Sequence, residues 1–282
     1  MTNFVVLQSG GPTPVINRSL TGIIRKAKEL FPNNQVFGAR HGVEGLISDE
    51  LVDLTALGTS DLDIIDQTPG AVLGSTRHKI TLEELPIILD TLDKNRIDIL
   101  HIIGGNDSAE TGMDIQKYAS RLDHELQVIN VPKTIDNDLV ETDHCPGFGS
   151  TAKFIALATL GIGMDTKSMG KYAPVAIMEV MGRDTGWLAA ASGLLKRSQD
   201  EPPHFIGIPE QNIDEKHFID VIHNSLTSYG YAVAVVAENA TTDTQLLQKE
   251  RSPYLTDDFG HEYHDSIGKY LSTTLSQKLK VR

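Results

Sequence analysis

The sequence predicts an α/β protein made of two three-layer (α/β/α) domains with mostly parallel sheets. Short apolar runs typical of buried strands alternate with stretches in which apolar residues recur at helical spacing. The connections between them are short, which is typical of parallel sheets whose crossover helices cover both faces. A chain of 282 residues, 40% of them hydrophobic, can bury one large core or two smaller ones.

In the first half of the chain, each predicted strand leads into a loop and then a helix. The first strand ends in the tight loop Ser9–Thr13, and a later one runs directly into Gly104–Ser108. Pro132 stops the last apolar run, which has the composition of a short buried strand. The predicted strands cover residues 4–8, 35–39, 97–103 and 126–131, and the predicted helices cover 15–30, 81–94 and a stretch from about Ala109.

The second half repeats the same alternation. A helix is expected from Gly149, and strands are expected at residues 175–180, 205–208 and 231–237. We place the domain boundary after residue 141, which gives domains of residues 1–141 and 142–282. The last predicted helix, at about 258–279, is a candidate for packing back on the first domain.

Four polar loops are expected to lie close together. Right-handed crossovers bring the carboxyl ends of successive parallel strands to one edge of a sheet. Ligands of open α/β sheets bind at that edge. The loops at residues 10–13, 70–77, 104–108 and 132–138 are therefore predicted to converge on one active-site cleft that both domains share.

Charge and composition exclude several functions. The formal net charge of −13 argues against general binding to nucleic acid or to anionic membranes. No run of about eighteen apolar residues is present, so no membrane span is predicted. The N-terminus has no basic stretch before its first apolar run, unlike a signal peptide. The single cysteine, Cys145, excludes an internal disulfide and fits a reducing cytosol, so we expect a cytoplasmic protein.

The stretch Pro132–Asp138 concentrates two carboxylates, a lysine, a hydroxyl and an amide just after a predicted strand. Phosphoryl transfer needs such groups: a base for the attacking hydroxyl, a cation for the phosphate and an acid that holds a metal. The alternative is a polar surface turn, because Asp, Asn and Thr are common turn formers. A surface turn would be the better interpretation if the stretch stood alone. The other polar loops of the chain favour the phosphoryl-transfer site instead.

Two glycine loops and one arginine point to phosphate binding. Gly10–Gly11 and Gly104–Gly105 each join a predicted strand to a predicted helix, where free backbone amides can hold an anion. Neither loop has the spacing of a Walker or dinucleotide-binding loop, so each is a weak signal alone. Arg77 ends a Gly/Ser/Thr loop. It is either a solvated surface charge or a bidentate phosphate ligand.

Taken together, these motifs resemble the phosphofructokinase family in their order and spacing. The resemblance covers essentially the whole chain and implies the phosphofructokinase fold, with phosphoryl donor bound by residues 1–141 and sugar phosphate by residues 142–282. It rests on Gly10–Gly11, Gly74–Arg77, Gly104–Ser108, Pro132–Asp138, Met181–Arg183 and Glu238.

The resemblance also implies roles for individual residues. Asp136 matches the base that takes the proton from the 1-hydroxyl of fructose 6-phosphate, which contributes roughly a hundred- to ten-thousand-fold in rate. Thr134 and Lys133 are the other implied catalytic residues. Thr134 matches a residue that contacts the transferring phosphoryl group, and Lys133 adds a positive charge beside the phosphate that leaves as orthophosphate. The implied donor contacts are Gly11, Arg77, Gly105, Asp107 and Lys133, the implied sugar contacts are Thr134, Asp136, Met181, Gly182, Arg183, Glu238 and Arg282, and the implied Mg²⁺ ligands are Asn106, Asp107 and Asp138.

Two positions indicate which phosphoryl donor is used. ATP-dependent members usually have glycine where this chain has Asp107 and Lys133, whereas pyrophosphate-dependent members are similar to it at both. A carboxylate at 107 would crowd and repel the α-phosphate of ATP. The resemblance thus implies reversible transfer from pyrophosphate to fructose 6-phosphate in glycolysis, by a homodimer or homotetramer. The alternatives are an ATP-dependent 6-phosphofructokinase and a non-catalytic sugar-phosphate-binding protein.

Three features depart from the family pattern. Asn106 replaces a metal-binding aspartate, although an amide oxygen can still ligate a hard cation. Thr21 replaces an effector-binding arginine of allosteric members, while Arg25 is kept one turn later. Beyond Arg282, family members continue with a strand and a histidine/arginine pair for the sugar phosphate, so the chain is expected to lack part of that pocket.

Overall fold

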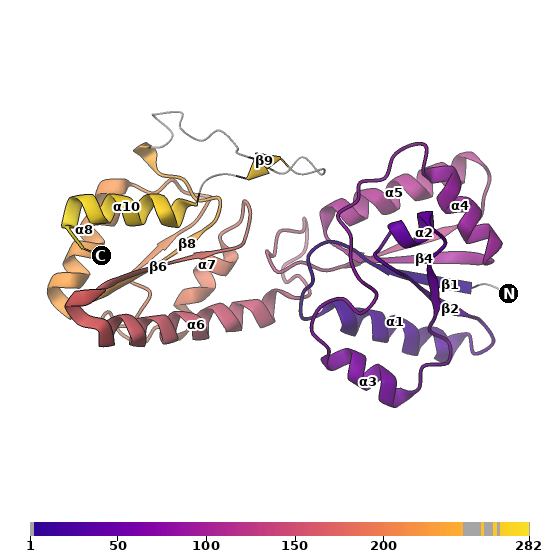
Figure 1. Cartoon of the computed structure of the whole chain (residues 1–282), viewed down its shortest axis with the longest axis horizontal. Helices are drawn as coiled ribbons and strands as arrows, with labels where there is room; N and C mark the ends of the chain where they lie inside the picture. Colours follow the sequence, from indigo (N-terminus) through magenta and orange to yellow (C-terminus); the bar gives the residue numbers. More distant parts are fainter. Residues whose placement is uncertain (1–2, 245–254, 257–261, 264–265, 282) are drawn as a thin grey trace. The chain divides into compact units, whose positions relative to one another are not determined.

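The computed structural model describes residues 3–244, 255–256, 262–263 and 266–281. The chain divides into two compact units, of which the first ends at Thr134 and the second begins at Ile135 (Figure 1). The sequence placed this boundary slightly later, after residue 141. Among the described residues, no helix has both the length and the apolar content needed to cross a bilayer.

The first unit is built on a five-stranded sheet with the order β3-β2-β1-β4-β5. All neighbouring strands pair in parallel except β3, which runs antiparallel to β2. This confirms the mostly parallel sheet predicted from the alternation of strands and helices. The strands are β1 (Asn3–Gln8), β2 (Val36–Ala39), β3 (Leu51–Asp53), β4 (Ile97–Gly104) and β5 (Gln127–Pro132).

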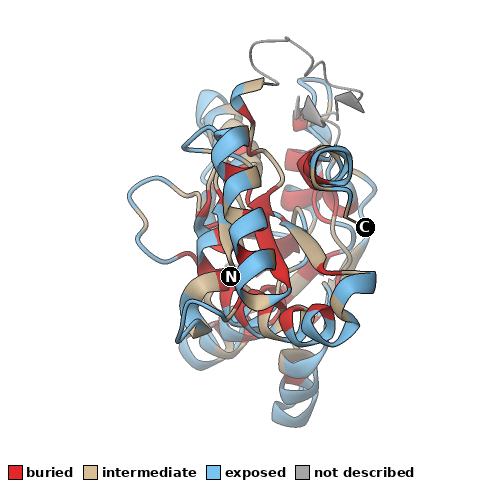
Figure 2. Ribbon diagram, turned by 90° about the vertical axis from the view of Figure 1, so that its left-hand side faces the viewer, coloured by how far each residue is buried: buried red, intermediate tan, exposed pale blue. Residues whose placement is uncertain are grey.

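Helices cover both faces of this sheet, so the unit has three layers (Figure 1). Phe4 and Val6 of β1 pack on one face with α1 and α3, while Val5 and Leu7 pack on the other with α2, α4 and α5. Every residue of β1 is therefore buried. Figure 2, seen from the side of the second unit, shows buried residues in the strands and exposed residues on the outer surfaces of the helices. The helices are α1 (Ile16–Leu30), α2 (Glu44–Ile47), α3 (Thr59–Gln67), α4 (Leu85–Lys94) and α5 (Asn106–Arg121).

Two sequence predictions about this unit are wrong in detail. The strand before Pro132 was expected to be buried, but β5 lies at the edge of the sheet and is largely exposed; Ile129 keeps 42% of its surface. The helix expected from about Ala109 begins at Asn106, directly after Gly105. This earlier start places Asn106 and Asp107 in the first turn of α5.

The second unit contains a three-stranded parallel sheet with the order β6-β8-β7. Its central strand β8 is fully buried, with α8 and α10 packed on one face and α6 and α7 on the other. The main elements are α6 (Phe148–Met169), β6 (Val175–Val180), α7 (Trp187–Ala191), β7 (Phe205–Gly207), α8 (Glu215–Tyr229), β8 (Ala232–Ala237) and α10 (Ile267–Leu279). Short 3₁₀ turns at Gly170–Tyr172 and Ser192–Leu195 and a strand pair, β9 (Leu255–Thr256) with β10 (Glu262–Tyr263), complete it.

The last helix packs within its own unit. Ile267, Leu271 and Leu275 of α10 join the cluster that also contains Ala232 and Val236 of β8. From the sequence, a helix at about 258–279 was a candidate for packing back on the first domain. Residues 257–261 and 264–265, at the start of that range, lie outside the described residues.

His101 of β4 makes the stability of the first unit dependent on pH. Its ring lies 6.3 Å from that of Phe4, and among the described residues its inaccessible Nδ1 has no hydrogen-bond partner. Burial lowers the pKa of this imidazole below its ordinary value, so the unfolded chain takes up the proton more readily. The contribution of His101 to stability is therefore fully present above a pH of about 6.5 and is lost as pH falls.

We expect His101→Phe to flatten the pH dependence of the free energy of unfolding below a pH of about 6.5. A single histidine contributes at most about 1.4 kcal/mol per pH unit to that slope. The measurement is urea unfolding at a series of pH values. The same replacement at exposed His223 is the control for loss of a histidine, and equal slopes for natural chain and His101→Phe would contradict this reading.

Candidate active site

Three strands of the first unit end at the same edge of the sheet. The pairing places Gln8 of β1 beside Ile103 of β4, and Gly104 of β4 beside Pro132 of β5. The polar loops that follow these strands are therefore neighbours, as the crossover rule predicted. They contain the glycine pairs at 10–11 and 104–105 and the residues Lys133 and Thr134.

Hydrogen bonds hold these loops together. Ser9 N–H donates to the Ile103 carbonyl (2.9 Å), and the Ser108 hydroxyl lies 2.8 Å from that of Ser9. The predicted loop at 70–77 joins the same group, because Gly10 N–H donates to the Thr76 carbonyl (3.1 Å) and the Ser75 hydroxyl to the Gly10 carbonyl (2.5 Å). These hydrogen bonds fix the three loops relative to one another.

Gly104 is required by close packing rather than by backbone freedom. A Cβ added at this position would lie 2.1 Å from Ser108 Oγ and 2.3 Å from Ser108 Cβ, distances that no real contact tolerates. The close approach lets α5 begin immediately after β4, with Gly105 as its N-cap. The N-terminal end of α5 then lies at the loop region, and the N-terminus of a helix stabilises an anion.

Lys133 supplies a positive charge inside this loop region. The residue is only 5% exposed, and its Nζ donates a 2.7 Å hydrogen bond to the Gly11 carbonyl. Its backbone N–H donates to the Gly104 carbonyl (3.0 Å), and a Cβ at Gly10 would lie 3.3 Å from Nζ. Lys133 is therefore anchored at both ends: its backbone bonds to Gly104 and its ammonium group lies against Gly10 and Gly11. The sequence alone did not predict this placement.

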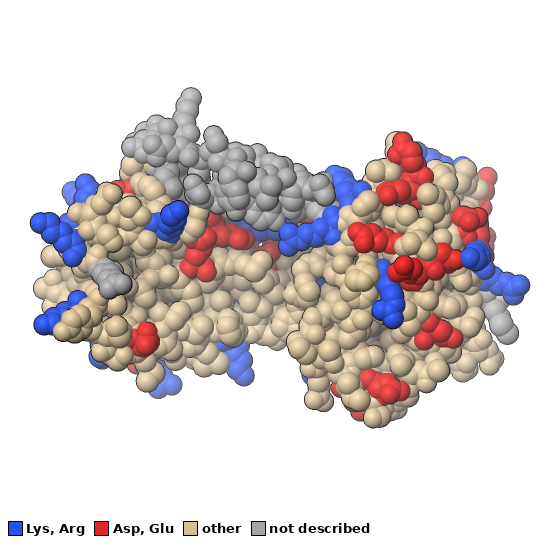
Figure 3. All heavy atoms as spheres, viewed as in Figure 1, with Lys and Arg blue, Asp and Glu red and all other residues tan. Residues whose placement is uncertain are grey.

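The acidic character of the whole chain makes an individual cation such as Lys133 important. Acidic side chains are prominent on the face of the first unit in Figure 3, in keeping with a net charge of −13. A phosphate ligand must therefore be neutralised locally by backbone amides and individual cations. Asp107, half-buried in the first turn of α5, adds a negative charge at the same edge, and Arg77 is exposed at the end of its loop.

In the second unit, Asp136 is 8% exposed, and both of its neighbours in the chain make contacts of their own. Ile135, immediately before it, packs against the cluster that includes Val180 and Leu188. Asn137, immediately after it, has a left-handed backbone (φ 59°). Its side-chain oxygen accepts from Cys145 N–H (2.7 Å), and its amide donates to the Asp143 carbonyl (3.3 Å). Both neighbours of Asp136 are therefore fixed.

The predicted sugar-phosphate loop is shaped by a carboxylate. Val180 of β6 pairs with Ala237 of β8, so Met181–Arg183 and Glu238 follow adjacent strand ends. Glu238 Oε1 accepts from the N–H groups of Gly182 (3.2 Å) and Arg183 (3.0 Å). Gly182 (φ 148°) and Arg183 (φ 48°) both have positive φ, which these bonds stabilise. Glu238 thus organises the loop that it was expected to accompany.

The predicted residues fall into two groups, one in each unit. The first unit brings Lys133 into contact with Gly11 and places Gly105, Asn106, Asp107 and Thr134 at the same sheet edge. The second unit joins Met181–Arg183 to Glu238 and holds Asp136 and half-buried Asp138 in one loop. Arg282 lies outside the described residues.

Sequence reasoning missed several residues that shape the site. Ser9 and Ser108 tie two loops, Asn137 fixes the backbone after Asp136, and Thr185 lies 2.8 Å from the Asp136 carbonyl. The left-handed backbone at Asn137 could have been predicted from the sequence, because asparagine adopts this conformation more readily than other residues except glycine. No local pattern indicates that Thr185 reaches a residue so far back along the chain.

The proposed metal ligands are all oxygen donors. Asn106, Asp107 and Asp138 offer one amide oxygen and two carboxylates, a set that suits Mg²⁺ better than softer metals. Asn106 and Asp107 stand together in one helical turn, whereas Asp138 belongs to the other unit. Among the described residues, no cluster of three His, Cys, Asp or Glu side chains is arranged to hold a metal. The donor chemistry fits the ion.

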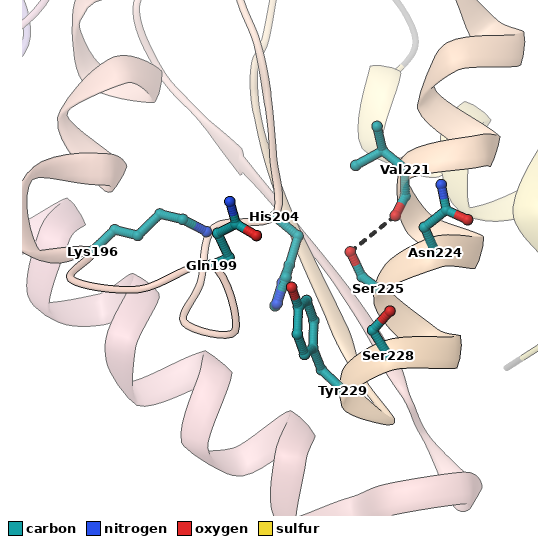
Figure 4. A pocket seen from close by; sticks show the side chains of 8 residues that line it. All are labelled: Lys196, Gln199, His204, Val221, Asn224, Ser225, Ser228 and Tyr229. Carbon is teal, nitrogen blue, oxygen red and sulfur yellow. Dashed lines mark hydrogen bonds between the residues drawn. The ribbon is translucent and has the colours of Figure 1, made fainter.

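A separate cavity of ≈ 290 Å³ lies at the opposite edge of the second sheet (Figure 4). Lys196, His204, Ser225 and Tyr229 are among its lining residues. His204 directly precedes β7 and Tyr229 ends α8 before β8, so the cavity adjoins the amino ends of strands. It contains none of the predicted site residues, which follow the carboxyl ends.

Comparison with known proteins agrees with the motifs. The family model described as "Phosphofructokinase" matches residues 3–282. The chain is 40% identical over 235 residues to the pyrophosphate–fructose 6-phosphate 1-phosphotransferase of Rhodospirillum rubrum, covering 83% of this chain and 57% of that protein. The enzyme of the same name from Xanthomonas campestris pv. campestris is 35% identical over 98% of this chain and 67% of its own length. The chain therefore spans between about half and two thirds of the length of these two relatives.

A solved structure gives the same result. The pyrophosphate-dependent phosphofructokinase from Marinobacter aquaeolei superposes with a TM-score of 0.86 at 34% sequence identity. The match covers all of this chain and 67% of that one. The two chains are therefore similar in amino-acid sequence as well as in the arrangement of their helices and strands.

Proposed function

The chain belongs to the phosphofructokinase family, and on that premise we propose that it moves a phosphoryl group from pyrophosphate to the 1-hydroxyl of fructose 6-phosphate. The products are fructose 1,6-bisphosphate and orthophosphate, and the reaction is reversible. The two relatives and the solved structure described above carry pyrophosphate, rather than ATP, in their names.

The observation that carries the proposal is the setting of Lys133. Its ammonium is buried on the carbonyl of Gly11, beside the glycine loop that follows β1. A cation in that position neutralises a compact phosphate without needing a nucleotide to hold it. Asp107, in the first turn of α5, adds negative charge where a longer polyphosphate would pass, which disfavours ATP.

The proposed chemistry uses few residues. The carboxylate of Asp136 takes the proton of the 1-hydroxyl as the sugar oxygen forms its bond to phosphorus. The bond to the leaving phosphate breaks at the same centre, and Lys133 stabilises the orthophosphate that departs. Thr134 contacts the transferring group, Arg77 the donor, and Arg183 the sugar phosphate. Positioning and charge neutralisation supply most of the rate in such a reaction.

A divalent cation completes the donor site in this proposal. Asn106, Asp107 and Asp138 would hold Mg²⁺, and the bound ion would neutralise charge on the pyrophosphate oxygens. The tasks of the chain itself remain those of orienting the donor, holding the sugar and accepting one proton. We further propose that the protein works in the cytoplasm, which its single, buried thiol supports. A homodimer or homotetramer stays a prediction that light scattering can check.

The decisive experiment compares donors on the purified 282-residue chain. Pyrophosphate and ATP are supplied separately with fructose 6-phosphate and Mg²⁺, and formation of fructose 1,6-bisphosphate is followed. We expect kcat/KM for pyrophosphate to exceed that for ATP by roughly ten- to a hundredfold, since charge-assisted contacts of about 1.5–3 kcal/mol separate the donors. Preference for ATP would favour an ATP-dependent kinase, and sugar-phosphate binding without turnover would favour a binding protein.

A further inference from the structure

Thr185 connects two parts of the proposed active site within the second unit. Its hydroxyl lies 2.8 Å from the backbone carbonyl of Asp136 and 3.0 Å from that of Gly182. Gly182 belongs to the loop expected to bind the sugar phosphate, and Asp136 is the proposed base. Thr185 itself is half-buried and follows that loop directly.

The hydroxyl has one proton for two carbonyl groups, and the two acceptors do not depend on it equally. The Gly182 carbonyl already accepts a 3.0 Å hydrogen bond from the backbone N–H of Thr185. That bond closes the turn whatever side chain stands at position 185. The particular contribution of the hydroxyl is therefore its bond to the Asp136 carbonyl.

We propose that Thr185 is a positioning residue for Asp136, holding the backbone of the base against the sugar-phosphate loop. This inference rests on the proposed function, in which Asp136 takes the proton of the 1-hydroxyl. A base must lie within hydrogen-bond reach of that proton when the sugar is bound. Thr185 connects the backbone of the base to the loop that holds the sugar. The distance between Asp136 and the bound sugar is thereby kept constant.

The other supports of each loop make this role separable from folding. Ile135 and Asn137 hold the backbone on either side of Asp136 without Thr185. On the sugar side, Glu238 binds Gly182 and Arg183, and Glu210 Oε1 accepts from Gly186 N–H (2.8 Å). Loss of the Thr185 hydroxyl should therefore leave both loops folded and weaken only the connection between them.

Thr185→Val removes the hydroxyl and keeps the branched shape, while Thr185→Ser keeps the hydroxyl. We expect Thr185→Val to lower kcat by roughly tenfold or more, because displacement of about 1 Å at a reacting group costs up to about a hundredfold. KM for fructose 6-phosphate should change little, since the sugar loop retains its own bonds. Thr185→Ser should restore most of kcat. Thr142→Val removes another hydroxyl, bonded to the Val140 carbonyl, and serves as the control.

A second readout does not need activity. The N–H of Cys145 donates to Asn137 Oδ1, so its hydrogen exchange reports how firmly the loop after Asp136 is held. We expect faster exchange at Cys145 in Thr185→Val, and natural rates in Thr185→Ser and Thr142→Val. Unchanged exchange in Thr185→Val, or faster exchange with natural kcat, would overturn the proposal. An inactive natural chain that still shows the exchange difference would overturn the proposed function and leave the tie between the loops established.

Discussion

Asp136→Ser is expected to lower kcat by roughly a hundred- to ten-thousand-fold, the range that a positioned base contributes. KM for fructose 6-phosphate should change far less, because the variant loses a group that acts in the transition state. Single-turnover and steady-state kinetics with pyrophosphate measure both quantities. The fold should survive, since Ile135 and Asn137 hold this loop through contacts that do not use the Asp136 carboxylate.

A matched control for this prediction stands in the same loop. Asp143 is exposed, and the contact that ties it to Asn137 uses its backbone carbonyl. Asp143→Ser should therefore keep natural kinetics. If Asp136→Ser retained the natural kcat, Asp136 would have no place in the mechanism, and another group would have to take the proton.

Donor choice gives the second large expected effect. Asp107→Gly should lower the ratio of kcat/KM for pyrophosphate to that for ATP by roughly ten- to a hundredfold, as charge repulsion and crowding at the donor are relieved. The separate roles of charge and size can be resolved with Asp107→Asn, which keeps the shape. A glycine in the first turn of α5 also costs the helix up to about 1 kcal/mol, so thermal unfolding should accompany the kinetics.

Replacement of Lys133 should also change the ratio of kcat/KM for pyrophosphate to that for ATP. Lys133→Gly, added to Asp107→Gly, should weaken pyrophosphate use further, because a cation is lost from a phosphate contact. The Lys133 side chain is buried between glycine loops, so its removal also leaves a cavity. Lys133→Met fills much of that space without charge and isolates the electrostatic effect. A donor ratio that stays at its natural value in all these variants would refute the assignment of donor choice to the two positions.

The sequence predicted most of the fold because its strands are strongly apolar and end in glycine loops. Strands β1, β4, β6 and β8 lie at or within one residue of the expected ranges. The burial of β5 was predicted wrongly, since an apolar run does not reveal whether a strand will have one neighbour or two. Strand order depends on contacts far apart in the chain, and within the described part of the chain β5 pairs with β4 alone.

The candidate site was predictable as a set of loops but not as a set of contacts. Gly11 and Lys133 were both named from sequence, yet nothing in it indicated that the Lys133 ammonium would bond to the Gly11 carbonyl. Glu238 was expected near Gly182, and its task of holding the backbone of that loop became clear only from geometry. Thr185 was missed because its partner lies 49 residues away in sequence.

The packing of Gly104 against Ser108 has a consequence for how this sequence can change over generations. Alanine at 104 would collide with both Oγ and Cβ of Ser108, so trimming Ser108 to alanine would not make room for it. Ser108 would have to become glycine first, which loosens the first turns of α5 and removes the hydroxyl that meets Ser9. Neither single step is neutral. Descendants of this chain should therefore keep glycine at 104 unless position 108 has already become glycine, whereas Ser108 can change alone at the cost of its contact with Ser9.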